Sequence, residues 1–218
     1  WPGPDVEAVA ALQPDLIVAN PYIDNIAQFE AIAPTVQLSP SDTPFREALF
    51  QFAELVGKTD RAGELEAEFE TTAARLQAEL GDKLTTTTVS IVEFWDGEIS
   101  TPPNKQSLGL AVPGLGMVRT AFEQTVDDWI TISAEQLGSN AADIMVLIAV
   151  PASQSGAEDT AFADFMDVPV VAATDVAKVD QIFAVHPRRI YGTSWAQAID
   201  AMEAFAEIIG QDTAQGAF

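Results

Sequence analysis

The chain of 218 residues contains no cysteine and a single histidine, His186. The first absence excludes disulfides, thiolate metal sites and cysteine nucleophiles, and the second excludes a metal site built from several histidines of this chain. Basic residues are also scarce, because ten Lys and Arg stand against 33 Asp and Glu, a net charge of −23. This charge repels phosphate backbones and anionic lipid surfaces, so neither nucleic acid nor a bare membrane surface is an expected partner.

Long apolar runs and common enzyme motifs are missing as well. No run of about 18 apolar residues occurs, so no membrane span is predicted, and neither a Walker loop nor a Gly-x-Ser-x-Gly elbow is found. The opening residues 1–4 lack the charged and apolar parts of a signal peptide, so an exported protein is expected to be a processed or truncated form here. The hydrophobic content of 48% is typical of a globular chain.

Residues 1–44 alternate between helical and extended patterns. Helices are predicted at 6–12 and 23–32 and strands at 15–19 and 35–38, which is an α/β order. The run after Asp15 is continuously apolar, as in a parallel strand buried on both faces. Two such strands need neighbours, so we expect this first lobe to be incomplete within the chain, with its remainder in a preceding segment or in another chain.

Residues 45–81 form a predicted helical connector. Apolar side chains recur at helical spacing over 45–56 and again over 61–80. A helix of about 20 residues is roughly 30 Å long, the width of a small domain. The second helix could therefore bridge two lobes.

Residues 82–218 are predicted to form a second α/β lobe. Asp96-Gly97 is a hairpin signal between two strands, and residues 106–122 suggest short helices and a loop. The patterns predict strands at 85–95, 98–100, 129–132, 143–150, 168–172 and 181–185, and helices at 133–137, 160–166 and 194–209.

The scarce cations concentrate after the last predicted strand. His186, Arg188 and Arg189 lie within four residues, and ligands of open α/β sheets bind at the carboxyl ends of strands. A positive site in an anionic protein favours an anionic ligand held by guanidinium groups. The alternative is that these arginines pair with surface carboxylates. Arg119, in the irregular stretch after strand 85–95, could reach the same cleft.

Aromatic residues follow other predicted strands. Tyr22 comes after strand 15–19, Trp95 ends strand 85–95, and Tyr191 follows the basic group. Such residues either cap the core or, where they converge on one cleft, form a stacking platform.

Three segments together resemble the substrate-binding proteins of ABC importers for ferric siderophores, haem and cobalamin. Residues 7–19 (EAVAALQPDLIVA) resemble that family's first-lobe helix and strand, residues 29–36 (FEAIAPTV) its following segment, and residues 55–62 (LVGKTDRA) its link into the long helix. The resemblance implies two α/β lobes joined by a rigid helix, with the ligand in the cleft between them. It also implies a bacterial periplasmic or cell-surface lipoprotein whose anchor is outside this chain.

The resemblance implies a function and a set of ligand contacts. The function is capture of a ferric siderophore and its delivery to an ABC permease, without catalysis and without an intrinsic cofactor or resident metal. Haem or cobalamin is an alternative ligand, and His186 or Tyr22 could then ligate haem iron. The expected ligand contacts are Tyr22, Trp95, Arg119, His186, Arg188, Arg189 and Tyr191.

Two other classes of function stay open at this point. One is an α/β enzyme, similar to a hydrolase, that acts on an anionic substrate with His186 as general base. The other is an interaction domain that binds no small ligand.

Overall fold

The computed structural model describes residues 3–39, 43–149 and 161–211. The chain divides into two compact units, Trp1–Thr59 (unit 1) and Asp60–Phe218 (unit 2). The boundary falls inside the segment 45–81 that the sequence marks as a connector. Each unit is described by itself.

Unit 1 contains a two-stranded parallel sheet with short helices. Asp5 caps its first helix, because its carboxylate accepts hydrogen bonds from the first-turn amides of Glu7 and Ala8, which have no acceptor within the helix. The parallel pairing is as predicted, but burial on both faces is not seen, since Val18 is 37% exposed. The elements are α1 (Val6–Ala11), β1 (Ile17–Ala19), α2 (Ile26–Glu30), β2 (Thr35–Gln37) and α3 (Phe45–Leu55).

Unit 2 is built on a mixed sheet, six-stranded in the part of the chain that the structure describes, with the order β6-β4-β3-β7-β8 and β5 added beside β3. The long strands β3, β7 and β8 are parallel, whereas β4 and β6 run antiparallel at one edge. The predicted hairpin joins β3 to β4, with positive φ angles at Asp96 and Gly97. The strands are β3 (Thr88–Trp95), β4 (Glu98–Thr101), β5 (Val118–Arg119), β6 (Ile130–Thr131), β7 (Ile144–Ala149) and β8 (Ile182–Val185).

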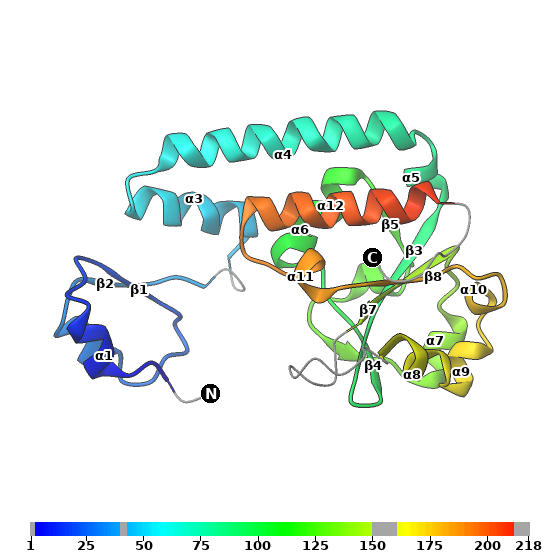
Figure 1. The fold of residues 1–218 in the computed structure, drawn as a ribbon, viewed down its shortest axis with the longest axis horizontal. Helices are drawn as coiled ribbons and strands as arrows, with labels where there is room; N and C mark the ends of the chain where they lie inside the picture. The colour runs from blue at the N-terminus through cyan, green and yellow to red at the C-terminus, as the bar shows by residue number, and fades with distance from the viewer. Residues whose placement is uncertain (1–2, 40–42, 150–160, 212–218) are drawn as a thin grey trace. The chain divides into compact units, whose positions relative to one another are not determined.

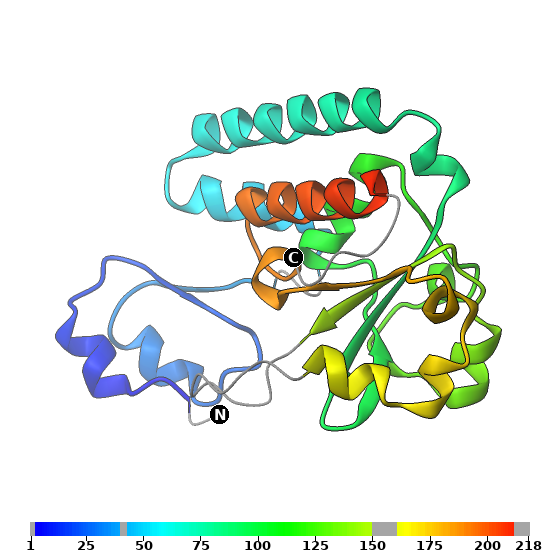
Figure 2. The ribbon, with the colours of Figure 1, turned by 45° about the vertical axis from the view of Figure 1, so that its right-hand side comes forward.

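Helices cover both faces of this sheet. Figures 1 and 2 show α6, α11 and α12 over one face, with α4 alongside α12, and α7 to α10 over the other. The 22-residue helix α4 is the long helix that the sequence predicts, and its Phe69 ring lies 5.4 Å from the Trp195 ring of α12. The helices are α4 (Thr59–Leu80), α5 (Lys83–Thr86), α6 (Gln106–Leu115), α7 (Ala134–Ser139), α8 (Ala161–Met166), α9 (Pro169–Ala172), α10 (Asp175–Lys178), α11 (Pro187–Ile190) and α12 (Trp195–Gly210). None of the helices described is both long and apolar enough to cross a bilayer.

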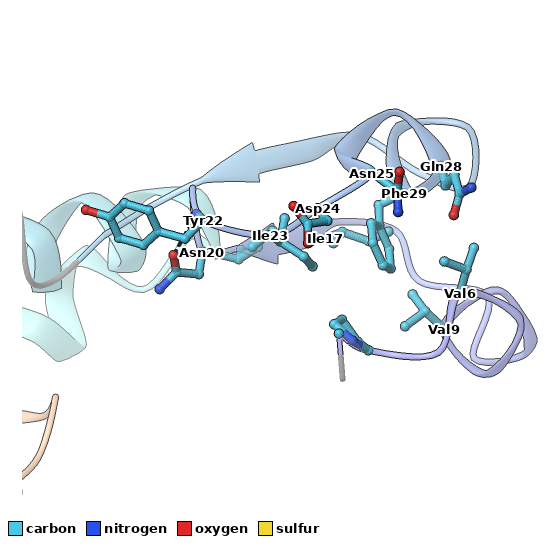
Figure 3. Close-up of a pocket in the computed structure, with 14 residues that line it drawn as sticks. Val6, Val9, Ile17, Asn20, Tyr22, Ile23, Asp24, Asn25, Gln28 and Phe29 are labelled. Atoms are coloured by element: carbon cyan, nitrogen blue, oxygen red, sulfur yellow. Dashed lines mark hydrogen bonds between the residues drawn. The ribbon is translucent and has the colours of Figure 1, made fainter. Parts of the chain in front are cut away.

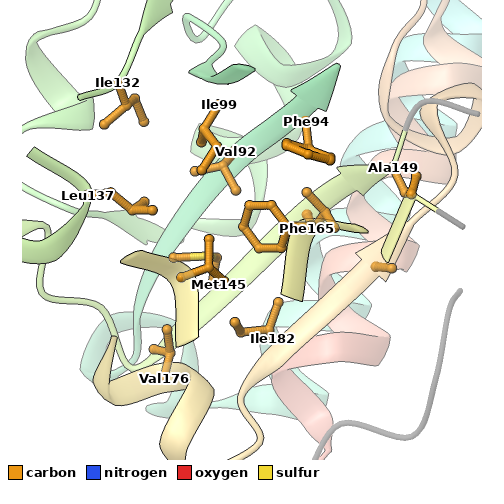
Figure 4. Packing of buried hydrophobic residues seen from close by; sticks show 14 residues of the cluster. Val92, Phe94, Ile99, Ile132, Leu137, Met145, Ala149, Phe165, Val176 and Ile182 are labelled. Carbon is orange, nitrogen blue, oxygen red and sulfur yellow. The ribbon is translucent and has the colours of Figure 1, made fainter. Parts of the chain in front are cut away.

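The core follows from the two-residue period of the strands. Alternate side chains of β3, β7 and β8 form the cluster in Figure 4, where Phe94 meets Phe165 of α8 edge-on at 5.5 Å. The intervening side chains, including Ile91, Val146 and Phe183, are also fully buried. Burial on both faces explains why these strands read as continuous apolar runs in the sequence.

Two predicted elements differ from the structure. Residues 168–172 are predicted as a strand, but they form the short helix α9, because Pro169 supplies the fixed φ of a first helical turn. The predicted strand 85–95 begins only at Thr88, since residues 83–86 form the short helix α5. The segment after β8, for which no element is predicted, forms α11, with Pro187 at its first turn. Val150 and Thr160, at the ends of two predicted elements, lie outside the described residues.

Candidate ligand-binding site

A row of polar and aromatic side chains lies on one face of the sheet corner formed by β3, β4 and β6. Trp95 pairs with Glu98 across the hairpin, and Glu93 pairs with Ser100. Directly paired residues and residues two apart project from the same face of a sheet. Ser100 also pairs with Thr131 of β6, which extends the row to Trp129, two residues earlier. The opposite face of the same strands carries the core residues Phe94 and Ile99.

These side chains line a hollow of about 490 Å³, here called the tryptophan hollow. Trp95 is 62% exposed and Trp129 is 47% exposed, so two large aromatic rings face solvent at one place. An exposed Trp leaves a large apolar area in water, and such area is typical of ligand-binding surfaces. The hollow is lined by Glu93, Trp95, Asp96, Glu98, Ser100, Trp129, Ile130 and Thr131.

Tyr191 braces one side of the hollow. Its hydroxyl donates a hydrogen bond of 2.7 Å to Glu93 Oε2, and its ring meets the Trp129 ring at 5.5 Å and 64°. Partial burial raises the pKa of Glu93, and the hydrogen bond from Tyr191 opposes that rise. Burial, followed by the neighbouring Glu93 charge, raises the pKa of the Tyr191 hydroxyl, which therefore stays protonated as a donor.

Arg119 does not face a ligand site, which corrects the expectation from the sequence. Its side chain is fully buried, and all five N–H donors have acceptors within the protein. Two donors go to Glu123 Oε2 at 2.7 and 3.0 Å, and the other acceptors are Thr101 Oγ1, Asn104 Oδ1 and the Pro102 carbonyl. A guanidinium group with every donor engaged has none to offer to an anion.

Glu123, which sequence reasoning missed, is the centre of this buried network. Oε2 also accepts from the Ile91 amide, and Oε1 accepts from Ser90 and Asn140. The carboxylate therefore ties β3 to the segments on either side of it, and its charge is balanced by Arg119. Its role is structural, and the only sequence signal for it is the four-residue spacing from Arg119.

The basic group after β8 separates into three different environments. His186 caps α11, because its Nδ1 accepts the Arg188 amide at 3.1 Å. Arg189 forms an ion pair of 2.9 Å with Glu207 on α12. This is the alternative in which the arginines pair with surface carboxylates and do not bind a ligand. Arg188 is exposed, and its side chain shows no hydrogen bond or ion pair to any residue in the described ranges.

The capping role of His186 bears on the enzyme hypothesis. An Nδ1 that accepts a backbone hydrogen bond leaves the proton of the neutral ring on Nε2. The exposed nitrogen is then a donor and does not serve as a general base in that state.

Tyr22 lies at a separate hollow in unit 1. The Asn20 side chain accepts the Tyr22 amide at 2.9 Å, which fixes the turn after β1, and the ring is 72% exposed. Figure 3 shows this ring pointing away from the apolar side chains, such as Val9 and Phe29, that line the rest of the hollow. Among the residues described, no group of three or more His, Cys, Asp or Glu could hold a metal ion.

A comparison with sequence families finds that the model for periplasmic binding proteins matches residues 3–194. The chain belongs to the periplasmic binding protein family. A curated relative is the probable siderophore-binding lipoprotein YfiY of Bacillus subtilis, 32% identical over 151 residues. That alignment covers 65% of this chain and 46% of the relative, so the chain spans about half the length of this family member.

Solved structures of other proteins share the fold of this chain. FhuD2 of Staphylococcus aureus with bound ferrioxamine B superposes with a TM-score of 0.75 at 21% identity, covering 94% of this chain and 79% of that one. FeuA of Bacillus subtilis, a triscatecholate siderophore binding protein complexed with ferri-bacillibactin, gives a TM-score of 0.76 at 19% identity, covering 95% and 75%. The α/β architecture with the long helix α4 is thus that of the family.

Proposed function

We propose that this protein captures a ferric siderophore and delivers it to an ABC permease, and that the tryptophan hollow is a ligand-contacting surface. The observation that carries the proposal is a pair of exposed tryptophans that line one hollow, Trp95 at the carboxyl end of β3 and Trp129 just before β6, in a chain of the periplasmic binding protein family. Ferric siderophores present a rigid, partly apolar surface around the metal, which aromatic faces bind through area and stacking.

The proposed contacts in unit 2 are Trp95, Trp129 and Tyr191. Tyr191 holds the Trp129 ring edge-on and is itself fixed by Glu93, so the surface is organised before ligand arrives. Tyr22 is a further proposed contact, since its ring is exposed on a fixed turn. Of the basic residues expected from the sequence, only Arg188 has an unengaged side chain among the described residues.

Delivery to a permease and attachment by a lipid anchor are further parts of the proposal. They rest on the family and on the lipoprotein name of the relative YfiY. Iron is the cargo in this scheme, and the protein's own residues hold the chelate without reacting with it.

The test is a titration of intrinsic tryptophan fluorescence with a ferric trihydroxamate, a ferric triscatecholate, a ferric carboxylate siderophore, haem and cobalamin. Trp95 and Trp129 are exposed at the hollow, so a bound ferric chelate should quench them. Saturable quenching at micromolar or lower concentration by a ferric siderophore supports the proposal. Saturable quenching by haem or cobalamin alone would mean that this compound, and not a ferric siderophore, is the ligand. Titrations of folded protein without any change across the panel would overturn the proposed function.

A further inference from the structure

The tryptophan hollow is acidic as well as aromatic. Glu93, Asp96 and Glu98 line it, and no Lys or Arg does. Asp96 and Glu98 are exposed at the β3–β4 turn, and Glu98 lies directly across the hairpin from Trp95. The hollow thus presents carboxylates beside the faces of tryptophan rings, an arrangement that favours positive charge on a ligand through direct attraction and through cation–π contact.

Within unit 2, no Lys or Arg lines the hollow. All ten Lys and Arg lie in the described ranges. Arg119 donates all its hydrogen bonds within its buried network, and Arg189 forms an ion pair with Glu207. Arg61, Arg75 and Lys178 also pair with carboxylates on their own helices, away from the hollow. Arg188, although unpaired among these residues, is not part of the lining.

The net charge of −23 acts in the same direction. A trianionic chelate, such as a ferric triscatecholate, would be repelled by the anionic protein as it approaches. At the hollow it would also have to displace water from carboxylates of the same charge, so its binding is disfavoured. A ferric trihydroxamate is neutral at its core, since three hydroxamate charges balance the iron. A pendant ammonium group gives it one positive charge.

We infer that the protein selects ferric chelates of neutral or positive charge, and that a cationic tail on the ligand docks at the tryptophan hollow beside Asp96 and Glu98. The inference rests on the proposed function and specifies its substrate class. It reverses the expectation from the sequence, in which arginines bind an anionic chelate, because Arg119 and Arg189 are engaged within the protein and Arg188 does not line the hollow.

The experiment compares three ligands that differ in charge. Ferrioxamine B carries a free ammonium group, its N-acetylated derivative is the neutral analogue of nearly the same shape, and a ferric triscatecholate carries three negative charges. We expect ferrioxamine B to bind roughly five- to tenfold more tightly than the acetylated form, and the triscatecholate to bind roughly a hundredfold more weakly than ferrioxamine B. The first ratio should shrink as salt is raised, because the carboxylates are exposed.

A pair of matched variants locates the effect. Asp96→Asn with Glu98→Gln removes two charges from the hollow and keeps the side-chain shapes; Asn also tolerates the positive φ of Asp96. The control is Asp180→Asn with Asp167→Asn, which makes the same change in net charge. Asp180 is likewise an exposed residue with positive φ, but it precedes β8 and so lies at the opposite end of the parallel strands.

The outcomes are distinct. The inference stands if the preference for the ammonium form falls to within twofold in the hollow variant and persists in the control. It is overturned, with the proposed function intact, if the triscatecholate binds most tightly, if the acetylated and free forms bind equally, or if the hollow variant keeps the full preference. Absence of binding by every ferric chelate would instead overturn the proposed function.

Discussion

The Tyr191 hydroxyl donates a 2.7 Å hydrogen bond to Glu93 Oε2, joining residues 98 positions apart in the sequence. Glu93 belongs to β3 and Tyr191 follows α11, so the bond connects the sheet corner to the segment that covers it. The same tyrosine ring rests against Trp129. One side chain therefore fixes both a carboxylate and an aromatic face of the tryptophan hollow.

Glu93→Gln should change stability in a pH-dependent way. Burial raises the pKa of Glu93 above its ordinary 4.5, so the folded state holds this proton more tightly than the unfolded state. The stability that results is present below pH 4.5 and is lost as pH rises through the raised folded value. Glutamine does not titrate and still accepts from Tyr191. The melting temperatures of variant and parent should thus be similar at low pH. At neutral pH the melting temperature of the variant should be higher than that of the parent. A melting temperature of the variant that falls relative to that of the parent as pH rises would contradict this account.

Trp95→Ala and Trp129→Ala should each weaken binding of the ferric chelate by roughly tenfold, because an exposed aromatic contact contributes about 1 kcal/mol or more. Trp95 is 62% exposed, so its removal should leave the melting temperature within about 2 °C of the parent. Affinity is measured by calorimetry, which does not depend on the altered fluorophore. Val179→Ala is the control, since Val179 is an apolar residue 61% exposed before β8, at the far end of the sheet. Unchanged affinity in both tryptophan variants would exclude the hollow as the contact surface.

Glu123→Gln should destabilise unit 2 by about 3 kcal/mol or more, because it leaves the buried Arg119 charge unbalanced and sets an amide donor among other donors. The matched control is Glu79→Gln on α4. Glu79 also pairs with an arginine four residues away, Arg75, but both side chains are about half exposed. That change should cost about 0.5 kcal/mol or less. Chemical denaturation measures both, and equal losses would contradict the structural role given to the buried pair.

Arg188→Ala and Arg189→Ala should leave the affinity for a cationic ferric chelate within about twofold, since neither side chain lines the hollow. Arg189→Ala should also cost up to about 1 kcal/mol of stability through loss of its ion pair with Glu207, whose two side chains are 32% and 50% exposed. Calorimetry and denaturation measure the two effects. A tenfold loss of affinity in either variant would contradict this and would show that the basic group after β8 contributes to ligand binding.

The sequence predicts the elements well where one physical signal dominates. The apolar runs of β3, β7 and β8, the hairpin at Asp96-Gly97 and the long helix α4 are all confirmed. The prediction fails over 168–172, where three Val side chains and one Ala suggest a strand, but Pro169 starts a helix. β-propensity reflects packing on a sheet, and this segment has no sheet neighbour.

The site is less predictable, because it depends on contacts between distant segments. The sequence marks Trp95 at the end of a strand and Tyr191 after the basic group; Trp95 lines the hollow, and the Tyr191 ring packs against Trp129 beside it. Trp129 and Glu93 were missed, although a carboxylate within the apolar run of β3 and the alternation of Trp129 with Thr131 are signals for an exposed face. Arg119 was wrongly expected at the ligand surface, since its partners Thr101, Asn104 and Glu123 come together only in the folded chain.

The most direct test of the central claim uses the iron itself as a probe of distance. The protein is labelled with 5-fluorotryptophan, and its four tryptophan resonances are assigned by Trp→Phe variants. It is then titrated with the ferric chelate that binds most tightly, and with the gallium form of the same chelate as the diamagnetic control. Paramagnetic broadening falls steeply with distance, so the account predicts that Trp95 and Trp129, which line the hollow, broaden first, and that Trp195 of α12, which does not line it, is affected less. Broadening that is strongest at Trp195, or that spares both Trp95 and Trp129 under saturating ferric chelate, would contradict the account.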